Sequence, residues 1–443
     1  MESRITVGSI VIFALNHHPH ITRSIRDLLA LWLTCCCFAT FGVSCAQEHP
    51  EPQATLWNCG DSSPVIAAHY MPWFSNPETN PTPGVGWKHW NWAGPAVRHD
   101  PTSRREDGLR DLAATKYPLI GPYSSNNEAV IRYHFETARA AGIEAMIVIW
   151  YGPGSETDAV IPKLLEVAEA TGLKISLCYE EKINWAPFRA PASRKDLVDS
   201  AQRDLAYLLE KYSTDPAYLT RAGKPVVFQF NYWGEDEMGR RNILPHEWQR
   251  IFDGLARPLS YVRQNQDDAF HPPIGGRYLW FTKDENHIES FGVKARAQID
   301  EGQLEYFVGM ASPEFDDSGV NGWGNGTRAT PGAGLSLFKD TFERAWRNGP
   351  EMIQLVTWND FNEGTVIEPT LENGFQYLDA LEVWLGEKTG REVDLEDNRA
   401  PFQRYIENAS EAERNEVPHP ADEVVDRESK LDVVIPNYLE TLE

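Results

Sequence analysis

Residues 353–363 read Ile-Gln-Leu-Val-Thr-Trp-Asn-Asp-Phe-Asn-Glu, a largely apolar run that ends in aromatic and polar side chains. Such a run predicts a buried strand that leads into a loop. Similar runs recur along the chain, and we expect strands at residues 65–70, 145–150, 174–179, 226–230, 278–281, 305–310 and 353–358.

Helical patterns separate these runs. We expect helices at residues 127–141, 157–171, 193–211, 245–256 and 335–348. Strands that alternate with helices predict parallel βαβ units, and this number of units favours an α/β fold of the (β/α)8 TIM-barrel type. An eighth strand is expected either between residues 229 and 278 or after residue 363. No Gly-x-Gly-x-x-Gly follows the first strand, which argues against a dinucleotide-binding fold.

The composition is that of a globular protein with a strongly acidic balance. Apolar residues make up 42% and charged residues 24% of the 443 residues, and the formal net charge is −24. This charge repels phosphate backbones, so we expect no nucleic acid partner, whereas a neutral substrate is compatible with it. The 15 tryptophans suit stacking on sugar rings as well as core packing.

The N-terminal residues 1–46 have the layout of a signal peptide or membrane-proximal leader. Arg23 and Arg26 precede an apolar run at 28–43, and small residues around Cys45 follow it. The run is shorter than the ~20 residues that span a bilayer. We therefore expect an exported protein that is periplasmic, extracellular or membrane-anchored. Membrane association through an uncleaved leader or a lipidated Cys45 stays open.

The rest of the chain divides into three parts. We expect a linker at residues 47–63, the catalytic barrel at 64–388 and an acidic C-terminal extension at 389–443 that is solvated and packs lightly on the barrel. Beyond the leader only Cys59 and Cys178 remain, which gives no disulfide framework. The histidines show no ligand spacing, so we expect neither a metal nor a cofactor.

Two carboxyl groups follow the last predicted strand. In TIM barrels the catalytic groups gather where strands end, and two carboxyl groups usually cleave a glycosidic bond. Asp360 and Glu363 are three residues apart, which places both side chains on one side of a helical turn. They are the predicted catalytic pair, with helix capping as the alternative interpretation.

Four ordered blocks, at residues 69–74, 141–153, 313–317 and 357–369, resemble glycoside hydrolase family 99 and its relative family 71. The resemblance implies a (β/α)8 barrel that hydrolyses an α-linked mannan, as the family 99 endo-α-mannosidases and endo-α-mannanases do, or an α-glucan, as the family 71 α-1,3-glucanases do.

The resemblance also implies roles for individual residues. In the family 99 motif Trp-Asn-Glu-x-x-Glu the second Glu is the general acid, which corresponds to Glu363. The first Glu deprotonates the sugar 2-hydroxyl, and Asp360 stands at that position, as in the Trp-Asn-Asp of family 71. Tyr70, Trp150 and Tyr151 correspond to residues that line the family 99 cleft.

Other polar and aromatic residues at strand ends are candidates for binding an oligo- or polysaccharide, with loop packing and capping as alternatives. They are Trp73, Tyr179, Glu180, Asn231, Tyr232, Asp316, Arg328, Trp358 and Asn359. Two other functions stay open, a catalytically silent glycan-binding protein on the same barrel and a polysaccharide-assembly protein.

Overall fold

The computed structural model describes residues 56–59, 64–81, 84–181, 193–230, 243–264, 274–330 and 334–418. The predictions for the leader, for Cys45, for most of the linker and for Asn231 and Tyr232 lie outside these residues. The described residues all belong to one compact unit, residues 55–443.

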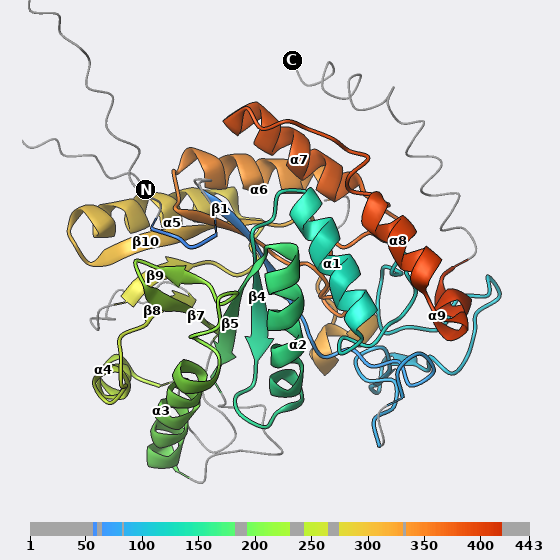
Figure 1. Cartoon of the computed structure of the whole chain (residues 1–443), viewed down its shortest axis with the longest axis horizontal. Coiled ribbons are helices and arrows are strands. Elements are labelled where there is room, and N and C mark those ends of the chain that lie inside the picture. Colours follow the sequence, from blue (N-terminus) through green and yellow to red (C-terminus); the bar gives the residue numbers. More distant parts are fainter. Residues whose placement is uncertain are drawn as a thin grey trace, which may run out of the picture. The chain divides into compact units, whose positions relative to one another are not determined.

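Parallel strands form a closed barrel (Figure 1). The ring runs β5-β4-β1-β11-β10-β9-β8-β7, and β7 pairs with β5 to close it. This confirms the predicted (β/α)8 TIM-type fold. The strands are β1 (Val65–Tyr70), β4 (Ala145–Trp150), β5 (Lys174–Glu180), β7 (Lys224–Phe230), β8 (Ser260–Gln264), β9 (Ile274–Tyr278), β10 (Leu304–Ala311) and β11 (Met352–Leu355).

The eighth strand, β8, lies in the first of the two intervals in which we expected it. The strand predicted at 278–281 is wrong in position, because β9 ends at Tyr278. β9 does not form a continuous apolar run, because it contains Gly275 and Gly276. A Cβ atom at Gly276 would lie only 2.8 Å from the ring of Tyr306, so close packing inside the barrel favours glycine there.

Helices cover the outside of the barrel (Figure 1). They are α1 (Glu128–Ala140), α2 (Glu156–Thr171), α3 (Arg194–Lys211), α4 (Pro245–Asp253), α5 (Glu285–Asp300), α6 (Leu335–Arg347) and α7 (Gln376–Thr389). The sequence pattern did not single out α5 and α7. Asn127 and Ser155 cap α1 and α2, because their side chains accept hydrogen bonds from backbone N–H groups of the first turn.

Short elements complete the described chain. They are β2 (Trp92–Ala93), β3 (Arg98–His99), β6 (Thr220–Arg221), the 3-10 turns Ser318–Val320 and Gly322–Gly324, and the C-terminal helices α8 (Ala400–Asn408) and α9 (Glu411–Glu416). None of the helices that the structure describes has the length and apolar character needed to cross a bilayer.

The acidic extension packs more closely than we expected from its composition, so the expectation of a loosely packed tail is wrong up to residue 418. α8 lies along α1, as Figure 1 shows, with Phe402 and Tyr405 buried between them. An ion pair also joins the extension to the barrel, since Arg399, the residue before α8, forms a buried two-bond pair with Asp379 of α7. Composition counts charges but does not show which of them are paired.

Candidate active site

A tight turn after β11 holds the predicted catalytic pair. The backbone N–H of Asp360 donates to Oγ1 of Thr357 at 2.7 Å, and Oδ1 of Asp360 accepts from the backbone N–H of Glu363 at 3.1 Å. These bonds close the turn and direct both carboxyl groups into one pocket. No helix starts in this described segment, so Asp360 closes a turn instead of capping a helix, and it also lines the pocket.

The pocket lies at the carboxyl ends of the strands, where TIM barrels carry their active sites. Its walls come from the ends of β1, β4, β5, β7, β9 and β11 and from two loops. The lining residues are Met71, Trp73, His89, Ile149, Tyr151, Glu180, Phe230, Trp280, Trp323, Asp360 and Glu363.

Three carboxyl groups share this pocket, and burial raises the pKa of each of them. The pKa of Asp360 lies well above its ordinary value because of burial and, next, the charge of Glu363. Burial and the same neighbouring charge raise the pKa of Glu180 to about 8. Glu180 therefore keeps its proton near neutral pH, and burial disfavours ionisation of the other two carboxyl groups. Shifted pKa values of this kind are typical of acid/base sites.

Trp323 and Arg328 act against this trend at Glu363. Burial raises the pKa of Glu363, whereas the indole N–H of Trp323 and the charge of Arg328 lower it. Nε1 of Trp323 donates to Oε1 of Glu363 at 3.3 Å, and Nη2 of Arg328 lies 3.8 Å from the same oxygen. Trp323 has φ of 57°, which is unusual for a bulky residue and fits a functional placement.

Arg328 is held by buried Asp317, the neighbour of the predicted binding residue Asp316. Oδ2 of Asp317 accepts from Nε of Arg328 at 2.7 Å, and Oδ1 accepts from its backbone N–H at 2.6 Å. Asp316 contacts the site only through its backbone, whose N–H donates to the carbonyl oxygen of Glu363 at 2.7 Å. Arg328 thus stands beside the predicted acid, while Asp316 does not line the pocket.

An aromatic wall faces the carboxyl groups. The ring of Trp73 stacks with His89 at 4.7 Å and with Tyr151 at 6.3 Å between centroids. Burial and the charge of Lys88 lower the pKa of His89 to about 3, so its imidazole is neutral. Flat, uncharged rings of this kind suit the apolar face of a sugar. The predicted residues Trp73, Tyr151 and Glu180 therefore do line the pocket.

Three predicted binding residues point away from the pocket, because side chains alternate along a strand. Tyr70 Oη bonds to Nδ1 of His134 on α1, Trp150 Nε1 donates to Asp158 on α2, and Tyr179 Oη donates to Asp204 on α3. Their sequence neighbours Met71, Ile149, Tyr151 and Glu180 line the pocket instead. The alternation of side chains along each strand would have separated the residues that face the pocket from those that face the helices.

Asn359 and Trp358 are also fully buried and support the site from behind. Oδ1 of Asn359 accepts from the backbone N–H of Met71 at 2.7 Å, which ties the end of β1 to the turn that carries Asp360 and Glu363. Trp358 packs against the ring of His134 at 5.7 Å. Sequence reasoning missed direct lining by Met71, His89, Ile149, Phe230, Trp280 and Trp323.

No group of three or more His, Cys, Asp or Glu side chains in the described part of the chain is arranged to hold a metal ion.

Carboxyl groups beside an aromatic wall at the carboxyl end of a (β/α)8 barrel define a glycoside hydrolase as the class of protein.

A family model described as glycosyl hydrolase family 99 matches residues 63–384, and the chain belongs to this family. The protein is a glycoside hydrolase, and its substrate is an oligo- or polysaccharide. This outcome confirms the resemblance inferred from the four sequence blocks.

Two curated relatives and one solved structure show the distance to known members. The chain is 24% identical over 356 residues to a rat glycoprotein endo-α-1,2-mannosidase, covering 72% of this chain and 71% of the relative. It is 24% identical to the corresponding Xenopus laevis protein over 334 residues, or 68% and 69% of the two chains. The fold is similar to the GH99 endo-α-mannosidase of Bacteroides thetaiotaomicron, with a TM-score of 0.54 and 19% identity over 76% of this chain and 98% of that chain.

Proposed function

We propose that this hydrolase cleaves α-mannosidic bonds inside an α-linked glycan by acid/base catalysis with Asp360 and Glu363. The observation that carries the proposal is the placement of both carboxyl groups in one buried pocket with raised pKa values. The names of the curated relatives favour mannan over the α-glucan that the sequence left open.

Glu363 is the proposed general acid. A general acid must be protonated at rest and must release its proton in the transition state. Burial favours the protonated carboxyl, while Trp323 and Arg328 stabilise the carboxylate that forms after the proton has moved to the glycosidic oxygen. The same carboxylate can then take a proton from the water that completes hydrolysis.

Asp360 is the proposed base. It takes the proton of the sugar 2-hydroxyl, and this oxygen attacks the anomeric carbon as the bond to the leaving oxygen breaks. Water then opens the resulting anhydro sugar, and Asp360 returns the proton to the 2-oxygen, so the product keeps the α configuration. Direct activation of water by Asp360 would instead invert the configuration.

The decisive experiment compares Glu363→Gln with the wild type on a natural α-mannan and on a substrate with an activated phenolate leaving group. We expect turnover of the mannan to fall by about 10²- to 10⁴-fold. The loss on the activated substrate should be smaller, because its phenolate leaving group departs without needing a proton. Glu169→Gln, a change at an exposed side chain of α2, is the control. Near-normal mannan turnover, or equal losses on both substrates, would refute the assignment.

A second measurement tests the route through the 2-oxygen. Proton NMR of the first product should show the α anomer, and a 2-deoxy substrate should be inert. A β product together with turnover of the 2-deoxy substrate would mean that Asp360 activates water instead.

We also propose that the protein is exported, on the basis of the leader at residues 1–46. Mass spectrometry of the protein recovered from the cell envelope and the medium should show loss of the leader or retention with a lipid on Cys45. An unmodified full-length chain found only in the cytoplasm would contradict this.

A further inference from the structure

The loop between β1 and α1, residues 71–127, builds one wall of the pocket. It carries Trp73 and His89, which line the pocket, and its described residues form little regular structure beyond β2 and β3. Such a loop needs other contacts to keep its pocket residues in place.

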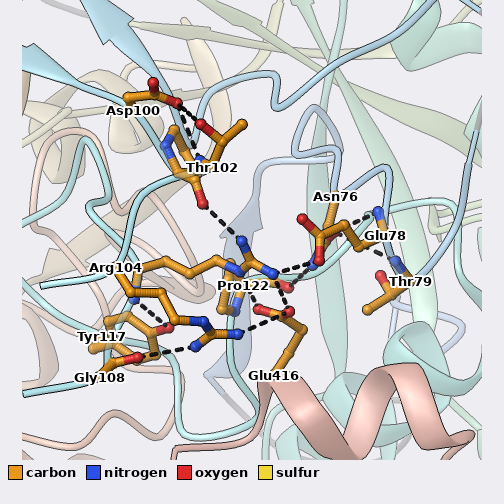
Figure 2. Close-up of polar contacts among 12 residues, drawn as sticks. Asn76, Glu78, Thr79, Asp100, Thr102, Arg104, Gly108, Tyr117, Pro122 and Glu416 are labelled. Carbon is orange, nitrogen blue, oxygen red and sulfur yellow. Dashed lines mark hydrogen bonds and ion pairs between the residues drawn. The ribbon is translucent and has the colours of Figure 1, made fainter.

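Arg110 is the centre of the contacts that hold this loop. Its guanidinium donates to both carboxylate oxygens of Glu416 and to Glu78, and Nη1 donates to the carbonyl oxygen of Pro101 at 2.8 Å. Arg110 and Glu416 are both buried. Figure 2 shows Glu416 gathered with Glu78 and Arg104 in this cluster. A two-bond guanidinium–carboxylate pair fixes orientation as well as distance.

Glu416 comes from the far end of the chain, at the last residue of α9. The backbone there lies directly on the loop, because a Cβ atom at Gly121 would meet the carbonyl oxygen of Glu416 at 2.1 Å. A second bond joins the same helix to the start of α1, since Nδ2 of Asn127 donates to Glu413 at 2.6 Å. The C-terminal segment therefore holds the loop through two residues of α9, Glu413 and Glu416.

The part of the loop that Arg110 holds contacts the turn that carries Asp360 and Glu363. The guanidinium of Arg110 lies 4.6 Å from the ring centroid of Trp87, two residues before His89. Nδ2 of Asn362 donates to the carbonyl oxygens of both His89 and Ala113, at 2.8 and 2.9 Å. Asn362 stands between Asp360 and Glu363, so the loop and the catalytic turn share these bonds.

We propose that Glu416 is a positioning residue for the sugar-binding wall. By holding Arg110 it keeps His89, and with it the stacked Trp73, at the place where the glycan binds, so the acidic C-terminal extension is part of the substrate-binding machinery. This inference rests on the proposed location of the active site.

The test compares Glu416→Gln with Asp379→Asn, a matched control. Both substitutions remove the carboxylate of a buried two-bond pair with arginine in the C-terminal region, but Asp379 pairs with Arg399 and does not touch the loop. With any glycan that the wild type cleaves, we expect Glu416→Gln to raise KM roughly 10-fold with a much smaller change in kcat, since displacement of a binding wall weakens positioning. Asp379→Asn should leave KM unchanged at a temperature at which both variants remain folded.

A double variant separates positioning from general loss of stability. If Arg110 and Glu416 act as one unit, Arg110→Gln combined with Glu416→Gln should raise KM no further than the worse single change does. If Glu416→Gln does not fold, Arg104→Gln is the second variant. It removes the contact of Arg104 with Glu416 at 3.4 Å, together with the bond from Arg104 to the carbonyl oxygen of Gly108 in the same loop, and should raise KM about 2-fold.

Equal KM values for Glu416→Gln, Asp379→Asn and the wild type would overturn the inference, as would additive effects in the double variant. Failure of the Glu363→Gln experiment would instead refute the proposed site. The two results are distinguishable because KM for a cleaved glycan is measured here without assigning the acid.

Discussion

Glu180 gives the sharpest link between the structure and a measurable pH dependence. Burial and the charge of Glu363 raise its pKa from the ordinary 4.5 to about 8. The native protein therefore binds more protons than the unfolded chain between these values. The stability that this group contributes is fully present below pH 4.5 and is lost as the pH rises through 8.

The magnitude follows from the two pKa values. Each unit of difference is worth about 1.4 kcal/mol, so the wild type should lose about 2 to 4 kcal/mol of unfolding free energy between pH 5 and pH 8 through this group. Glu180→Gln keeps the shape of the side chain and removes the titration. Its unfolding free energy should fall less over the same range, by that amount.

Urea unfolding followed by tryptophan fluorescence at pH 5, 6, 7 and 8 measures this difference. Glu181 also has a raised pKa, of about 7, but it is present in both proteins and cancels in the comparison. Glu169→Gln, at an exposed position, should follow the wild type. Parallel pH profiles for the wild type and Glu180→Gln would refute the reasoning.

Trp323→Phe removes the hydrogen bond that lowers the pKa of Glu363, so the alkaline limb of kcat/KM should move to higher pH in a pH–rate profile. Glu368→Gln weakens the buried bond from Tyr123 Oη, now at 2.7 Å, and should cost about 2 kcal/mol in urea unfolding; an unchanged midpoint would contradict this. Truncation after residue 388 removes α8 and α9 and uncovers buried surface of α1, so we expect loss of soluble protein on expression, and a folded, active barrel would contradict it.

The barrel was predictable because most of its strands are recognisable as apolar runs in the sequence. β1 and β4 are buried on both faces, and a strand of this kind is an almost continuous apolar run. β9 was misplaced and β8 was located only to an interval, since their residues include Gly275, Gly276 and Arg263, whose fit depends on neighbours across the barrel. Such neighbours are not visible in a local sequence window.

The placement of Asp360 and Glu363 in the pocket was predictable, but the set of other lining residues was only partly so. Asp360 and Glu363 are close in sequence, and their spacing alone places them together. His89 and Trp323 reach the pocket from distant loops through left-handed backbone conformations, with φ of 59° and 57°. No local pattern predicts such a conformation in a non-glycine residue, because tertiary contacts impose it.

The short side chain of Asp360 fits the hydrogen bonding of this turn. Its Oδ1 caps the backbone N–H of Glu363, a role that suits aspartate, whose carboxylate reaches the backbone a few residues ahead. The charges of Glu363 and Glu180 add to burial in raising its pKa, so the pocket disfavours ionisation of all three groups together. Ionisation of Asp360 would therefore raise the pKa of Glu363 further, so that Glu363 keeps its proton. Aspartate is one methylene shorter than glutamate. If Asp360 acts as the proposed base, the sugar therefore has to bind close to the turn, against the wall that Trp73 and His89 form.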